Sequence, residues 1–98
     1  MKEFQQVLDN LSKPENTTFI SFDIDSIAST FCPGVSCPAV IGLISQEALD
    51  ICFAAGKCGN IRFLDISEFN PDIEEDRTGR LVATVVYYFL MGIADRVS

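Results

Sequence analysis

The sequence predicts an α/β fold in which a small parallel sheet is covered by helices. Helix-like and strand-like segments alternate along the 98 residues in the order helix, strand, loop, helix, strand, loop, helix. This order is typical of βαβ units, in which a helix crosses between two parallel strands. The hydrophobic content of 48% is sufficient for a packed core. The length corresponds to one small domain or to part of a larger one.

The N-terminal segment predicts a short amphipathic helix. Its apolar residues recur at the spacing of one helix face: Phe4, Val7, Leu8 and Leu11. Residues 13–16, which include a proline, are expected to end this helix. Residues 17–24 are β-branched and aromatic, and they predict a strand that is buried on both faces. Residues 26–44 contain two prolines and two glycines and predict a long loop.

A second helix and a second strand follow this loop. Ser45 is a suitable N-cap residue, residues 46–55 predict the helix, and Gly56 is expected to close it. Residues 61–66 predict the second strand. Because a helix separates the two strands, they are expected to pair in parallel.

The C-terminal segment predicts an acidic loop at residues 70–77 and a long helix over residues 78–94. The apolar residues of that helix occur nearly all around it: Leu81, Val82, Val85, Val86, Tyr88, Phe89, Leu90 and Ile93. Such a helix is normally buried on several sides, and a parallel sheet usually has more than two strands. We therefore expect residues 1–98 to form one partial domain that self-associates or needs a missing N-terminal part.

The charge pattern excludes two classes of partner. The net charge is −7, and the chain has neither histidine nor a basic run. Binding to nucleic acid and to an anionic membrane surface are therefore not expected. The N-terminus lacks the apolar core of a signal peptide, so the four cysteines predict reduced thiols in a cytoplasmic protein. Without histidine or a C-x-x-C pair, they do not predict a zinc site.

Two like charges lie at the end of the first predicted strand. Asp23 and Asp25 are two positions apart, which on a strand places both side chains on the same side. Ligands of open α/β sheets bind beyond the carboxyl ends of the strands. A hard divalent cation with oxygen ligands would balance the two carboxylates. The alternative is that the strand stops at Ile24 and that Asp25 is an ordinary loop or capping residue.

A D-x-D pair at the end of a buried strand is similar to two known families. The haloacid-dehalogenase-type phosphotransferases have a small turn residue and then Thr or Val after the second aspartate. Here Ser26 and Ile27 follow, so the match to that family is partial.

The second resemblance extends further along the chain. Residues 21–25 (S-F-D-I-D), the Pro33-Gly34 pair and Gly42 resemble the metal-binding signature of the ureohydrolase family, which includes arginase, agmatinase and formimidoylglutamase. Residues 65–71 (D-I-S-E-F-N-P) resemble the family's D-x-x-E-x-N-P segment and also lie at a strand end. The loop P-G-V-S-C-P at residues 33–38 is closer to formimidoylglutamase than to arginase. The resemblance covers about residues 18–94.

The resemblance implies a βαβα portion of the three-layer arginase-like fold and a site for two manganese ions. By that likeness Asp23 bridges both metals and Asp25 chelates one. Glu68 faces the cationic amidine or guanidino group of a small-molecule substrate, through a charge-assisted contact. Ser36 and Cys37 lie in the loop that shapes the substrate pocket, where Cys37 replaces a usual threonine. The implied reaction is hydrolysis of a C–N bond in a linear amidine by a metal-activated water.

Two family segments have no counterpart in this chain. The G-G-D-H and D-x-H-x-D segments, which supply further metal ligands, contain histidine, and the chain has none. Two aspartates cannot complete two coordination spheres, so the chain resembles a C-terminal part of a ureohydrolase and is expected to be inactive alone. A second interpretation stays open. Ala28 and Ser29 replace a usual Asp-Pro pair, as expected of a non-catalytic homologue that acts as an interaction or regulatory module.

Overall fold

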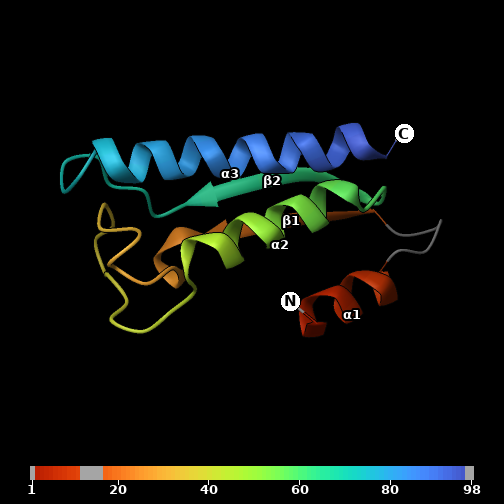
Figure 1. Ribbon diagram of the computed structural model, residues 1–98, viewed down its shortest axis with the longest axis horizontal. Coiled ribbons are helices and arrows are strands. Elements are labelled where there is room, and N and C mark those ends of the chain that lie inside the picture. Colours follow the sequence, from red (N-terminus) through yellow and green to blue (C-terminus); the bar gives the residue numbers. More distant parts are fainter. Residues whose placement is uncertain (1, 12–16, 97–98) are drawn as a thin grey trace.

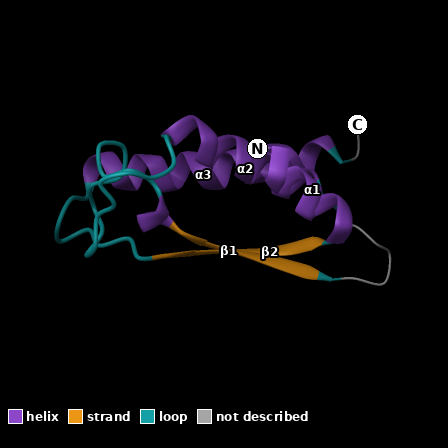
Figure 2. Cartoon of the chain, turned by 90° about the horizontal axis from the view of Figure 1, so that it is seen from below, coloured by secondary structure: helices purple, strands orange, loops and turns teal. Residues whose placement is uncertain are grey.

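The computed structural model describes residues 2–11 and 17–96, and its helices lie over one face of a two-stranded sheet (Figures 1 and 2). The elements in chain order are α1 (Lys2–Leu11), β1 (Thr18–Asp23), the 3-10 turn η1 (Ile24–Ser26), α2 (Ser45–Lys57), β2 (Ile61–Ser67) and α3 (Asp76–Asp95). Helices α2 and α3 pack against each other and against the sheet, and α1 contacts α2. The predicted order of elements is therefore confirmed.

The two strands pair in parallel, as the sequence predicted. The register begins at Thr18 opposite Ile61, shifts by one residue, and then runs from Phe19 opposite Phe63 to Asp23 opposite Ser67. Because both strands run in the same direction, their carboxyl ends lie at the same end of the molecule, where the long loops also gather (Figure 1). The sheet face away from the helices carries Phe19 and Phe63, which are 64% and 68% exposed.

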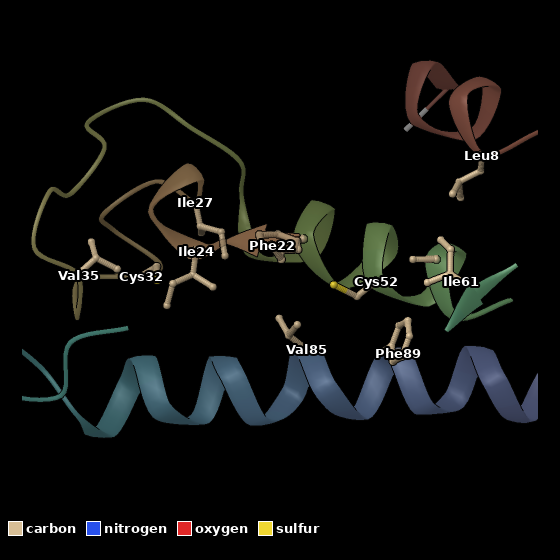
Figure 3. Packing of buried hydrophobic residues seen from close by; sticks show 12 residues of the cluster. Leu8, Phe22, Ile24, Ile27, Cys32, Val35, Cys52, Ile61, Val85 and Phe89 are labelled. Carbon is tan, nitrogen blue, oxygen red and sulfur yellow. The ribbon is translucent and has the colours of Figure 1, made fainter. Parts of the chain in front are cut away.

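The core lies between the helices and the sheet (Figure 3). Val85 and Phe89, one helical turn apart on α3, point toward Cys52 of α2 and Phe22 of β1, and all four are buried. The core continues past the strand end into the loops, where these residues are almost completely buried: Ile24, Ile27, Cys32 and Val35. The beginning of the predicted long loop is thus part of the core.

Helices α2 and α3 approach closely where Gly56 faces Gly92. A Cβ atom built on Gly92 would overlap the carbonyl oxygen of Phe53 and would lie 2.9 Å from the Cα of Gly56. The prediction that Gly56 ends the second helix is therefore wrong. The helix continues to Lys57, and Gly56 lies within it because this crossing leaves no room for a side chain.

Several other boundaries also differ from the predictions. The first strand ends at Asp23, because Ile24 begins a 3-10 turn. Ser45 is the first residue of its helix, and the N-cap residue is Ile44. The Glu47 carboxylate accepts a hydrogen bond from the backbone N–H of Ile44 at 3.0 Å. The last helix begins at Asp76, two residues before the predicted start. The predicted helix-ending segment 13–16 lies outside the described residues.

The last helix keeps part of its apolar surface exposed, as its all-round pattern predicted. Its outer face includes Val86, Tyr87 and Leu90, which are 37%, 61% and 54% exposed. Within the described ranges, none of the helices combines the length and the apolar character that crossing a membrane requires.

Candidate functional site

Asp23 and Asp25 lie at the carboxyl end of β1, but the backbone between them is not a strand. Asp23 is the N-cap of the 3-10 turn, and its Oδ1 accepts a hydrogen bond from the backbone N–H of Asp25 at 3.2 Å. Ser26 Oγ donates to the Asp23 carbonyl oxygen at 2.7 Å. The expectation that a strand places both side chains on one face is therefore wrong in its geometry. The turn, and not the strand, sets the relation of Asp25 to Asp23.

The two carboxyl groups are nevertheless neighbours. A hydrogen bond with the Asp23 side chain raises the pKa of Asp25 above its ordinary value, and partial burial and the negative charges of Asp23 and Glu68 act in the same direction. Mutual repulsion of close carboxylates favours the protonated form, and a bound cation would remove that penalty. The site is therefore acidic and receptive to positive charge.

Glu68 follows β2 directly and has an unusual backbone conformation. Its φ is +76°, the one positive φ of a non-glycine residue in the described part of the chain. A non-glycine residue in the left-handed region costs about 1 to 3 kcal/mol unless the surroundings enforce it, and such strain concentrates at functional sites. Because Asp23 pairs with Ser67, the left-handed turn at Glu68 begins beside the carboxylate pair.

The loop that carries Ser36 and Cys37 is joined to the segment after Glu68. Val35 and Phe69 form an antiparallel bridge. The backbone N–H of Asn70 donates to the carbonyl oxygen of Gly34 at 2.6 Å, and its Nδ2 donates to Ser36 Oγ at 3.1 Å. The structure thus brings the P-G loop and the D-x-x-E-x-N-P segment together. Cys37 is exposed.

Sequence reasoning missed the residues that anchor this loop to α3. The buried hydroxyl of Thr78 accepts a hydrogen bond from the backbone N–H of Gly34 at 2.8 Å and donates to Glu74 Oε1 at 2.7 Å. Glu74 was expected to be one of several acids in a solvated loop. No local sequence pattern indicates this contact, because Gly34 lies 44 residues before Thr78 in the chain.

The described residues by themselves do not form a metal site. Among residues 2–11 and 17–96, no three His, Cys, Asp or Glu side chains are grouped so that they could hold a metal ion. Octahedral or binuclear oxygen sites need more ligands than two carboxylates. Asp23 and Asp25 can therefore supply part of a metal site but not a complete one.

Comparison with known families places these residues in context. Residues 1–92 match the model of the arginase family. The chain belongs to the arginase family. Its parallel βαβα arrangement is accordingly a portion of the arginase-like α/β fold, as the resemblance implied.

Several formimidoylglutamases are among the similar arginase-family proteins. The Staphylococcus aureus (strain JH9) formimidoylglutamase is 40% identical over 68% of this chain and 22% of its own length. That of Cupriavidus pinatubonensis is 32% identical over 76% of this chain and 23% of its own length. A crystal structure of Trypanosoma cruzi formiminoglutamase with manganese superposes with a TM-score of 0.86 and 44% identity, over 96% of this chain and 33% of that one.

An arginase is also similar in structure. The Entamoeba histolytica arginase bound to L-ornithine has a TM-score of 0.83 and 30% identity, over 90% of this chain and 30% of that one. The chain therefore spans about a quarter of the length of the curated relatives and about a third of the solved structures. The resemblance of its motifs to formimidoylglutamase is confirmed at this level.

Proposed function

We propose that this chain supplies one part of the substrate and metal site of a formimidoylglutamase-like ureohydrolase. The observation that carries the proposal is the placement of Asp23, Asp25 and Glu68 at the carboxyl ends of two neighbouring parallel strands, where the charge of Glu68 acts on Asp25. Open α/β sheets bind ligands at this edge. The likeness to a manganese-containing formiminoglutamase supports manganese as the metal.

Each acidic residue has a role in this proposal. Asp23 and Asp25 are metal ligands, because carboxylate oxygens are the donors that hard divalent cations prefer. When bound, the metal supplies a water of lowered pKa. Glu68 binds the cationic amidine group of the substrate through a charge-assisted hydrogen bond. Ser36 and Cys37 line the substrate side of the site, within the loop that Asn70 holds.

The remaining ligands come from polypeptide outside this sequence. The chain has no histidine and no described group of three metal-binding side chains, and we propose that residues 1–98 are one partial domain. Its bare sheet face and its sheet edges fit the same proposal, because unpaired strand edges accept further strands. We propose that they are covered by polypeptide that corresponds to the other two thirds of the solved structures. Alone, the chain is expected to hydrolyse neither formimidoylglutamate nor arginine.

A chimera tests this function directly. Residues 1–98 replace the matching segment of the Trypanosoma cruzi formiminoglutamase, and hydrolysis of formimidoylglutamate is measured with added manganese. We expect metal-dependent turnover, and a loss of more than about a hundredfold with Asp23→Asn or Asp25→Asn, since even residues that only orient a metal ligand cost 10- to 100-fold. Asp50→Asn, on the exposed surface of α2, is the matched control and leaves the rate unchanged.

The same experiment distinguishes the second interpretation. A chimera that folds and binds manganese but does not turn over the substrate contradicts the enzymatic proposal. That result favours the non-catalytic homologue, in which the chain acts as an interaction or regulatory module and the departures at Ala28 and Ser29 mark the loss of chemistry.

A further inference from the structure

The P-G loop (residues 33–38) is joined to α3 by a series of hydrogen bonds. This series involves none of the three acidic residues of the site, Asp23, Asp25 and Glu68. It runs from the backbone N–H of Gly34 to Thr78 Oγ1 at 2.8 Å, and from that hydroxyl to Glu74 Oε1 at 2.7 Å. The same carboxylate accepts hydrogen bonds from the backbone N–H groups of Thr78 and Arg77, each at 2.7 Å. Glu74 thereby caps the first turn of α3, where its negative charge is also favoured by the helix dipole.

The hydroxyl of Thr78 acts as both donor and acceptor in this arrangement. Its single hydrogen is donated to the Glu74 carboxylate, so a lone pair remains to accept from Gly34. Thr78 is fully buried, and it is the buried polar residue of the described core. A buried hydroxyl with both partners satisfied is well defined in position, whereas loss of one partner leaves a costly unsatisfied group.

The contact also requires glycine at position 34. A Cβ atom there would overlap the carbonyl oxygen of Glu74 and lie 2.8 Å from Thr78 Oγ1. The loop backbone therefore lies directly against the start of α3. A second link, from the Arg77 guanidinium to the carbonyl oxygen of Thr30 at 2.7 Å, ties an earlier part of the same loop to this helix.

The far side of the loop faces the site. The carbonyl oxygen of Gly34 accepts from the backbone N–H of Asn70, and Ser36 Oγ accepts from the Asn70 side chain. Asn70 lies two residues after the strained Glu68. Gly34 is consequently held on both sides, because Thr78 binds its backbone N–H and Asn70 binds its carbonyl oxygen.

We propose that Thr78 is a positioning residue, whose buried hydroxyl fixes the P-G loop against α3 and so sets where Ser36 and Cys37 lie relative to Glu68. This inference rests on the proposed function only in treating these residues as the substrate side of the site. The hydrogen-bonded chain itself belongs to this sequence, so it can be tested without activity.

The test compares two substitutions in the full 98-residue chain. Thr78→Val keeps the branched shape and removes the hydroxyl, and Thr78→Ser keeps the hydroxyl. In Thr78→Val we expect amide hydrogen exchange of Gly34 to accelerate roughly tenfold and the backbone NMR signals of Ser36 and Cys37 to move. In Thr78→Ser we expect exchange within about twofold of the natural chain and signals at their original positions.

A second pair of variants does not depend on a core substitution. Glu74→Gln removes the charge that orients the hydroxyl, and it should accelerate Gly34 exchange by about threefold, since hydrogen bonds to charged groups are the stronger ones. Glu75→Gln, an exposed neighbour on the same segment, is the matched control and should leave the exchange unchanged.

Labelling of buried thiols separates positioning from general stability. Cys32 lies in the loop region of the core and Cys52 lies between the two long helices. Faster labelling of Cys32 alone in Thr78→Val supports the proposal, because loss of the Thr78 hydrogen bond, which lowers the pKa of the Cys32 thiol, would by itself slow the labelling. Equal acceleration at both thiols, unchanged Gly34 exchange, or a Thr78→Ser variant that behaves like Thr78→Val would each overturn it. Failure of the chimera described above would refute the proposed function without changing any of these readouts.

Discussion

Replacing Gly92 by alanine tests the close crossing of α2 and α3. Alanine normally stabilises the interior of a helix by about 0.5 to 1 kcal/mol relative to glycine. Here the added Cβ would overlap the carbonyl oxygen of Phe53 and lie 2.9 Å from the Cα of Gly56. All of these obstacles are backbone atoms, so no side-chain rotation can relieve them. The helices must therefore separate.

The size of the effect follows from this geometry. Carbon atoms in favourable contact are about 3.5 to 4.0 Å apart, so the crossing must open by roughly 0.6 to 1 Å. Overpacking of this kind costs about 1 to 3 kcal/mol, and the helix-propensity gain offsets only part of it. We expect Gly92→Ala to lower the free energy of unfolding by about 1 to 2 kcal/mol, a large part of the stability of a small domain.

Gly79→Ala is the matched control in the same helix. Its added Cβ would meet only the Phe69 ring, at an ordinary contact distance of 3.7 Å, so it should raise the free energy of unfolding by up to about 1 kcal/mol. Urea unfolding followed by circular dichroism measures both, with a midpoint change of roughly 0.5 to 1 M for Gly92→Ala at the slopes typical of small proteins. A Gly92→Ala midpoint equal to or above that of the natural chain would refute the close crossing.

Further predictions concern thiol reactivity, metal binding, pH and association. Burial raises the pKa of Cys52 to about 12. At pH 8 an alkylating reagent should therefore modify the exposed Cys37 and leave Cys52 of the folded chain unmodified, which peptide mass spectrometry can measure. Early modification of Cys52 would show that the core is open. Calorimetry should detect only weak manganese binding by the chain alone, and tight binding that Asp23→Ala abolishes would mean that the chain holds more of the site than two carboxylates. Hydrogen bonds from the Arg77 and Thr78 backbone hold the pKa of Glu74 below its ordinary value of 4.5. The contribution of Glu74 to stability is therefore present above pH 4.5 and is lost as the pH falls through the lower folded-state pKa. Thermal melts from pH 6 to 3 should show less of this loss in Glu74→Gln, and identical profiles for the two proteins would contradict the prediction. The exposed apolar faces predict self-association of the isolated chain, and light scattering that finds a monomer with a concentration-independent melt would argue instead for a complete domain.

The sequence by itself determined the order of the elements, the parallel pairing and the location of the acidic site. Apolar periodicity reports which residues leave water, and it therefore identified both strands and all three helices within a few residues. The spacing of Asp23, Asp25 and Glu68 after those strands identified the edge of the sheet where they meet, because parallel strands end on the same side. These features depend on local pattern and on chain direction, which one sequence contains.

Only the tertiary structure decided how these residues are held. Asp25 meets Asp23 through a 3-10 turn and not along a strand, a choice made by the hydrogen bond between their backbone and side chain. Gly56 ends no helix, because another helix lies against it. Thr78 holds a loop 44 residues earlier in the chain. A hydrogen bond or a close approach between such distant residues leaves no periodic trace in the sequence, since it depends on where folding brings two segments together.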